Sequence, residues 1–207
     1  MNPDPDIIVT LDQLYAHYGD PIPTALIKEL GSISGHYRQF IEASPFVILA
    51  TSGPDGMDCS PRGDPAGFVR VVDEHTLLIP DRRGNNRVDS LRNIVSNPQV
   101  ALLFLIPGIG EAMRVNGSAC LSVNQELRQS LAMGDKVPRS VIVITVESIY
   151  PQCQKAVVRS KLWDASTQIP RTALPTVGEM MTAITQGEFD GKAYDEAYPE
   201  RLRQTIY

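Results

Sequence analysis

One stretch of alternating apolar and polar side chains constrains the fold of this chain more than any other feature. From Met113 to Val123, apolar residues or glycine occupy the odd positions, and polar residues or cysteine occupy the even ones. Successive side chains of a β-strand point to opposite faces, so this period of two predicts a long strand with one buried face. The other face is then either wet or lines a site.

Short apolar runs joined by turns surround this strand. They predict strands over Phe46–Thr51, Gly67–Val72, Thr76–Ile79, Val100–Ile106 and Val141–Val146, with Met57–Ser60 as a less marked candidate and helices over Arg87–Ser96 and Gln125–Met133. Because strands mostly follow strands, antiparallel pairing is favoured over a doubly wound parallel sheet. We expect a mainly β fold of the α+β class, a small and partly open barrel of about six strands with helical additions.

Both ends of the chain carry helical patterns instead. Leu11, Leu14, Tyr15 and Tyr18 recur at three- and four-residue steps, and the tail favours helices near Val177–Ile184 and Lys192–Arg203. We therefore divide the chain into an N-terminal helical extension (1–43), a central β-barrel domain (44–163) and a C-terminal helical extension (164–207). The extensions are expected to cover open sheet edges, to widen a dimer contact or to form a lid.

The charge balance argues against a protein that coats nucleic acid, because 24 acidic residues outnumber 19 basic ones and the formal net charge is −5. The longest apolar runs fall far short of the roughly 20 residues that span a bilayer. The first ten residues carry acids where a signal peptide would carry basic residues. We expect a cytoplasmic protein with no membrane partner.

The cysteines and histidines form no recognisable site. Cys59, Cys120 and Cys153 are odd in number and widely spaced, so we expect reduced, mostly buried thiols and neither a disulfide framework nor a zinc site. The three histidines lie far apart in the sequence, and no metal is expected. A phosphate-binding P-loop and a nucleophile elbow are absent as well, so no catalytic residue is identified.

A basic turn between a predicted strand and a predicted helix is the best candidate for a binding site. Residues 80–87 hold Arg82, Arg83 and Arg87 around a glycine, and Asn86 is expected to be the N-cap of the helix. Free N–H groups at a helix start attract anions, and arginine adds planar donors that match a phosphate. We expect Arg83, Asn86 and Arg87 to hold a terminal phosphate, with Arg62 and Arg70 on neighbouring strands.

Two other interpretations of the same arginines stay open at this point. The turn could be a solvated basic loop, or it could bind an RNA backbone. RNA binding would call for exposed aromatic side chains between the arginines, and Phe68 is the only aromatic residue nearby.

The stretch from Phe46 to Val123 resembles the FMN-binding split β-barrel of the pyridoxamine 5′-phosphate oxidase superfamily, closest to an FMN-binding subgroup within it. The matching pieces are Ile48–Gly56, Cys59–Asp64, Leu78–Asp81, the basic turn, Leu91–Ile94 followed by Asn97-Pro98, and Arg114–Gly117. The tail piece Cys153–Trp163 is similar to that subgroup too, so the resemblance spans roughly residues 46–163.

The resemblance implies a six-stranded antiparallel split β-barrel that binds FMN at a homodimer interface. It assigns the FMN phosphate to Asn86 and Arg87, with Arg82, Arg83 and Asn85 in the same turn. It places Pro80 and Asp81 along the ribityl chain or the ring edge. The remaining cofactor residues that it implies are Arg62, Gly63, Asp64 and Arg70 on the strands lining the flavin, and Arg159 and Trp163 from the partner subunit.

The sequence departs from the family's oxidase in two places. Asn86 stands where that oxidase usually has a basic residue, and the tail lacks its arginine–tryptophan substrate clamp in the expected form. Ser118, in turn, stands where relatives in the subgroup often have a basic residue. These differences disfavour pyridoxamine phosphate as the substrate and leave FMN binding intact.

The resulting hypothesis is an FMN-dependent oxidoreductase that acts on a small molecule of unknown identity. Flavin supplies the redox chemistry in such proteins, and the chain supplies position and electrostatics. The alternatives are a non-catalytic flavin-binding or electron-carrier module and a reductase of the same fold that uses the deazaflavin F420. A barrel that binds RNA or a protein partner is disfavoured by the acidic balance and the sparse aromatic residues.

Overall fold

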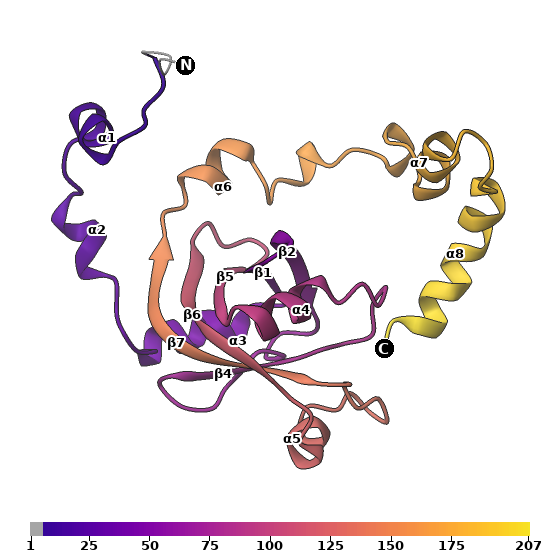
Figure 1. Ribbon diagram of the computed structural model, residues 1–207, viewed down its shortest axis with the longest axis horizontal. Coiled ribbons are helices and arrows are strands. Elements are labelled where there is room, and N and C mark those ends of the chain that lie inside the picture. Colours follow the sequence, from indigo (N-terminus) through magenta and orange to yellow (C-terminus); the bar gives the residue numbers. More distant parts are fainter. Residues whose placement is uncertain (1–5) are drawn as a thin grey trace.

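The computed structural model describes residues 6–207, and one antiparallel sheet forms its body (Figure 1). Residues 1–5 of the expected N-terminal extension lie outside the described part. The sheet has seven strands in the order β2-β1-β5-β6-β7-β4-β3. They are β1 (Phe46–Gly53), β2 (Gly56–Gly63), β3 (Arg70–Val71), β4 (Thr76–Pro80), β5 (Gln99–Leu105), β6 (Ala112–Ser122) and β7 (Val141–Gln152).

The expected antiparallel, mainly β fold is confirmed, but the expected six-stranded barrel is wrong. Met57–Ser60 does form a strand, as part of β2, and the hairpin over residues 67–79 contributes only a two-residue strand β3 beside β4. The sheet has seven strands and is open, because β2 and β3 lie at its two ends and do not pair with each other. An edge strand leaves backbone donors and acceptors unpaired.

The alternation of apolar and polar residues over 113–122 lies in β6, where it separates a buried face from a more exposed one. Met113 and Val115 are buried while Arg114 between them is exposed. A shift in the β6–β7 register lies between Asn116 and Gly117. A Cβ atom at Gly117 would collide with the backbone oxygen of Thr145, so only glycine fits this close approach of two strands.

Two helices cover the sheet and complete the core. α3 (Gly35–Ala43) starts at the N-cap Ser34 and buries Ile41 completely. α4 (Asp89–Ser96) packs on β1, β2 and β6 and buries Ile94. The largest fully buried side chains are Phe104, Ile41, Leu49, Leu77, Ile79, Leu102, Met113, Ile142, Ile144 and Ile149.

Apart from α5, the remaining helices form two arms beside the sheet (Figure 1). The N-terminal arm holds α1 (Leu11–Tyr18) and α2 (Pro23–Ile27), and α5 (Gln125–Ser130) connects β6 to β7. The C-terminal arm holds α6 (Lys155–Ser160), the short 3-10 helices η1 (Ala165–Thr167) and η2 (Arg171–Ala173), α7 (Val177–Ile184) and α8 (Gly191–Thr205). The helices expected near 11–18, 177–184 and 192–203 are therefore present.

Three further features concern the cysteines, the metal-ligating side chains and the length of the helices. The cysteines are free, but all three are exposed, because Cys59 and Cys120 lie on outward faces of β2 and β6 and Cys153 follows β7. No cluster of histidine, cysteine and acidic side chains that could hold a metal occurs within residues 6–207. Over the same residues, no helix has the length and apolar character needed to cross a membrane.

Candidate functional site

A cleft of about 1130 Å³ lies between the edge strand β2, the loop that follows β4 and the start of α4. Most of the residues predicted for the cofactor line it: Arg62, Gly63, Asp64, Pro80, Asp81, Arg82, Arg83, Asn85, Asn86 and Arg87. The β1–β2 hairpin and the β4–α4 connection bring these two sequence segments together. The open edge of the sheet is therefore where the predicted residues converge.

Three predicted residues lie elsewhere on the described chain. Arg70 on β3 donates hydrogen bonds to the hydroxyl and the carbonyl oxygen of Ser130, and it does not line the cleft. Arg159 is exposed on α6, and the Trp163 indole donates to the carbonyl oxygen of Ile109 at 2.8 Å. A role of Arg159 and Trp163 in a partner's site stays a prediction.

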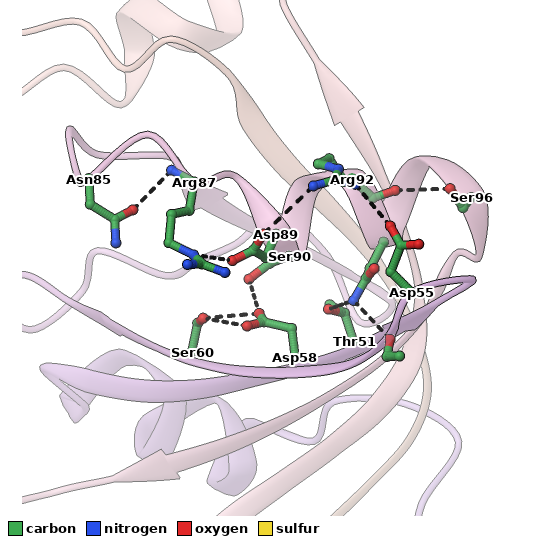
Figure 2. A network of polar contacts seen from close by, with 12 residues as sticks. Thr51, Asp55, Asp58, Ser60, Asn85, Arg87, Asp89, Ser90, Arg92 and Ser96 are labelled. Carbon is green, nitrogen blue, oxygen red and sulfur yellow. Dashed lines mark hydrogen bonds and ion pairs between the residues drawn. The ribbon is translucent and has the colours of Figure 1, made fainter. Parts of the chain in front are cut away.

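Arg62 is tied to the first turn of α4 through a buried hydroxyl. Its Nη2 donates to the Ser90 Oγ at 3.0 Å, and that hydroxyl in turn donates to the Asp58 Oδ2 at 2.5 Å. Ser60 also donates to the Asp58 carboxylate, as Figure 2 shows. Ser90 is only 2% exposed, so this chain of hydrogen bonds fixes the arginine beside the helix start.

The Nε of Arg62 is the one buried side-chain nitrogen or oxygen in the described residues that lacks a hydrogen-bond partner. A buried donor without a partner costs free energy, so such groups are rare in native structures. This donor belongs to a guanidinium in a cleft lined by further arginines. A turn of the guanidinium toward the cleft would bring this donor to an acceptor on a bound ligand, above all an anionic one.

The start of α4 differs from the expected one. The helix begins at Asp89, and its N-cap is Val88, which makes no side-chain capping bond. Asn86 is not the cap: it has a φ of 62°, and its Oδ1 accepts a hydrogen bond from Arg139. Since no side chain caps this end, the N–H groups of its first turn are left for solvent or a ligand.

Val88 itself has a left-handed backbone, with a φ of 55°. A β-branched residue adopts this conformation at a cost, and such strain concentrates at functional loops. Together with Asn86, it makes the sharp turn that brings residues 82–87 over the helix start. The backbone of this loop therefore adopts a less favourable conformation at two positions close together.

The arginines at the mouth of the cleft are partly paired. Arg87 donates to Asp89 at 2.8 Å, and this hydrogen bond raises the pKa of Arg87 (Figure 2). Arg92 lies near Asp55 and Asp89. Arg83 is exposed and makes no hydrogen bond or ion pair with any residue that the structure describes. The loop therefore keeps free positive charge for a ligand.

A buried ion pair closes the other end of the cleft. Arg82 Nε donates to Asp64 Oδ2 at 2.6 Å, and the two side chains are 17% and 1% exposed. Arg82 also donates to the carbonyl oxygen of Leu131, and Tyr207 donates its phenolic hydrogen to Asp64 Oδ1 at 2.8 Å. Both carboxylate oxygens of Asp64 are thus hydrogen-bonded.

Asp81 lies between these two ends. Burial raises the pKa of its carboxyl, while the charges of Arg62 and Arg139 act in the opposite direction. Its backbone N–H donates to the carbonyl oxygen of Ser140. The pairing of Pro80 with Val141 brings Arg139 and Ser140 to the cleft.

The sequence did not predict Arg139, Tyr207 or the Asp58–Ser90 pair as site residues. For Arg139, the available signal was a basic residue just before the predicted strand at 141–146. Its place in the cleft follows only from the pairing of β7 with β4, which the sequence did not indicate. For Tyr207, no local signal exists, because its partner Asp64 is 143 residues away in the chain.

Known proteins give the following comparisons. The profile of the family described as pyridoxamine 5′-phosphate oxidase matches residues 33–153. No curated protein matches the sequence.

The solved structures that the chain resembles include three of low identity. HupZ of Group A Streptococcus is 20% identical over 58% of this chain and 94% of its own, with a TM-score of 0.48. General Stress Protein 26 of Bacillus anthracis is 17% identical over 55% and 88%, with a TM-score of 0.42. An F420 reductase is 20% identical over 56% and 98%, also with a TM-score of 0.42.

Proposed function

Because the chain belongs to the pyridoxamine 5′-phosphate oxidase family, we propose that its cleft binds FMN and that the protein is an FMN-dependent oxidoreductase acting on a small molecule. The observation that carries the proposal is the buried, unpartnered Nε of Arg62 beside the uncapped start of α4. Both features are hydrogen-bond donors that lack an acceptor, and the FMN phosphate is an anion of suitable size.

The residues of the cleft fit this cofactor. The free N–H groups of the α4 start, with Arg62, Arg83 and Arg87 around them, form a donor set for a phosphate. Phe68 and Leu91 supply apolar lining farther along the cleft. A volume of about 1130 Å³ leaves room for a small second ligand beside a cofactor, since ligand sites commonly measure about 300–1000 Å³.

In this proposal, the chain's own residues position and shield the reacting molecules. The flavin, when bound, would accept or donate the electrons. Arg62 would anchor the phosphate, held in place by Ser90 and Asp58. Asp64 and Arg82 would form a rigid wall, because burial and three hydrogen bonds hold their side chains.

We further propose that the functional unit is a homodimer. The N-terminal arm leaves large apolar side chains exposed, with Leu11 at 66%, Tyr18 at 78% and Ile27 at 78%. The C-terminal arm does the same with Val158 at 60% and Ile184 at 75%. Exposed apolar surface of this extent is typical of interfaces, and a second copy would cover it.

Purification and spectroscopy test the proposed cofactor. We expect the purified protein to show the two visible absorption bands of oxidised flavin, or to acquire them when FMN is added. Mass spectrometry of the material released by heat should then give FMN. A single deazaflavin band would replace FMN with F420. A colourless protein that does not quench the fluorescence of added FMN would refute the proposal.

Sedimentation velocity tests the proposed dimer. We expect the full chain to sediment with twice the monomer mass of 22.7 kDa. A monomer at micromolar concentration, with FMN present, would refute the homodimer and leave the cofactor proposal standing.

A further inference from the structure

Tyr207 occupies the cleft like a ligand. Its ring lies under the Arg82 guanidinium, 5.9 Å from the guanidinium carbon to the ring centroid. Its hydroxyl donates to Asp64 Oδ1 at 2.8 Å, and with Ile206 it lines the cleft. The phenol is the group recognised, because its hydroxyl and its ring each meet a matching partner.

The partners of this phenol are fixed without it. Asp64 and Arg82 are joined by their own ion pair, and both are largely buried. The Asp64 backbone N–H donates to the carbonyl oxygen of Pro45, and Arg82 is also tied to Leu131. The carboxylate oxygen that accepts from Tyr207 is thus preorganised, and it would remain in place if the ring left.

Tyr207, by contrast, follows α8 in an arm that makes few contacts with the sheet. α7 and α8 pack chiefly against each other, through the close contact of Gly178 with Gly191. Their path arches away from the sheet, and the chain returns to it near Tyr207 (Figure 1). A wall of the cleft is therefore built from a side chain that can leave while its binding partners stay.

We propose that the space filled by the Tyr207 ring is a subsite for a hydroxylated aromatic ligand, and that Tyr207 occupies it until such a ligand displaces the ring. A ligand phenol would donate to Asp64 Oδ1 and lie under Arg82, as the Tyr207 phenol does. The interpretation of this ligand as the substrate rests on the proposed flavin function. The subsite itself does not depend on that function.

Occupation of the subsite by the Tyr207 ring should weaken ligand binding by a measurable factor. A ligand that competes with a docked side chain binds more weakly, by the fraction of molecules in which the subsite is vacant. One hydrogen bond to a charged acceptor is enough to hold the ring docked in about nine molecules of ten. Removal of the ring should therefore strengthen ligand binding by about tenfold.

The test uses p-cresol, which is the tyrosine side chain as a free molecule, and isothermal titration calorimetry on the full chain. We expect Tyr207→Ala to bind p-cresol about tenfold more tightly than the unaltered protein does. Tyr207→Phe should fall between them, because its ring stays but loses the bond to Asp64. We expect 4-methylanisole, which cannot donate a hydrogen bond, to bind Tyr207→Ala at least about tenfold more weakly than p-cresol.

Tyr198→Ala is the matched control, because Tyr198 lies on α8, stacks on Tyr194 and does not line the cleft. It should bind p-cresol as the unaltered protein does. If Tyr207→Ala gains no affinity, or binds the two probes equally well, the subsite does not exist. A gain of the same size in Tyr198→Ala would show that a loosened arm is the cause, and it would overturn the proposal.

FMN titrations on the same variants separate the two proposals. FMN binding without the p-cresol pattern would refute the subsite alone. The p-cresol pattern without FMN binding would refute the proposed flavin function and leave the subsite as a binding site for hydroxylated aromatic compounds.

Discussion

The substitution Arg62→Gln gives the sharpest test of the proposed cofactor site in the cleft. Arg62 carries a buried Nε without a partner, and Ser90 and Asp58 hold it beside the start of α4. Glutamine removes the charge and both Nη groups, and its shorter side chain leaves only a neutral amide near the position of Nε. A phosphate that bonds to Arg62 would lose a charge-assisted hydrogen bond.

The size of the expected effect follows from that bond. A hydrogen bond to a charged group contributes about 1.5–3 kcal/mol, and 1.4 kcal/mol is a factor of ten in affinity, so the Kd for FMN should rise about 10- to 100-fold. Riboflavin lacks the phosphate, so its Kd should change by less than about threefold. The ratio of the two Kd values isolates the phosphate contact from any general loosening of the cleft.

Fluorescence quenching of the two flavins measures both constants on the same preparations. Arg114→Gln is the control, because Arg114 is exposed on β6, contacts Tyr150 and does not line the cleft. If Arg62→Gln weakens FMN and riboflavin by the same factor, Arg62 does not hold the phosphate. If it weakens neither, the reasoning from the unpartnered nitrogen is wrong.

The remaining predictions concern the same loop and its surroundings. Asp81→Asn should raise the Tm at pH 7. Burial raises the pKa of the Asp81 carboxyl in the folded state, so its ionisation costs stability once the pH rises above its ordinary pKa of 3.8. In thermal melts, the gain in Tm should therefore vanish below that pH. A gain that persists at pH 3 would contradict this origin. Val88→Gly should stabilise the chain by about 0.5–1 kcal/mol in urea unfolding, because glycine adopts the left-handed backbone without strain. FMN affinity should stay within about threefold, since the backbone donors remain, and a collapse would mean that the valine side chain touches the ligand. Arg70→Gln should leave the FMN Kd unchanged, because Arg70 bonds to Ser130 outside the cleft, and a loss like that of Arg62→Gln would place Arg70 in the site after all.

Local patterns predicted the elements of this fold well. The alternation at 113–123 gave β6 within a residue at each end, and the helical pattern at 177–184 matches α7. Both patterns depend on side-chain periodicity, which burial on one face imposes directly. The basic turn at 80–87 was also found locally, because arginines and a glycine between a strand and a helix have a clear chemical meaning.

Features that depend on distant partners escaped prediction. The N-cap of α4 was assigned to Asn86 by residue type, but its amide is engaged by Arg139 and its backbone is left-handed. The expected barrel failed because closure depends on pairing between the first and last strands of the sheet, and β2 and β3 do not pair. Tyr207 reaches the cleft only through the path of the C-terminal arm, which no periodicity encodes.

The open sheet makes the width of the cleft a property of the whole fold. β2 lies at one end of the strand order, and β4 lies next to the other end, with β1, β5, β6 and β7 between them. Each pair of neighbouring strands adds its own rotation, so a small change of twist in the middle is carried outward to both ends. We therefore expect a change of twist at the Gly117 irregularity, in the central strand, to alter the separation of β2 and β4. Residues outside the cleft would then influence the affinity for the proposed cofactor, because they set how far apart the two ends of the sheet lie.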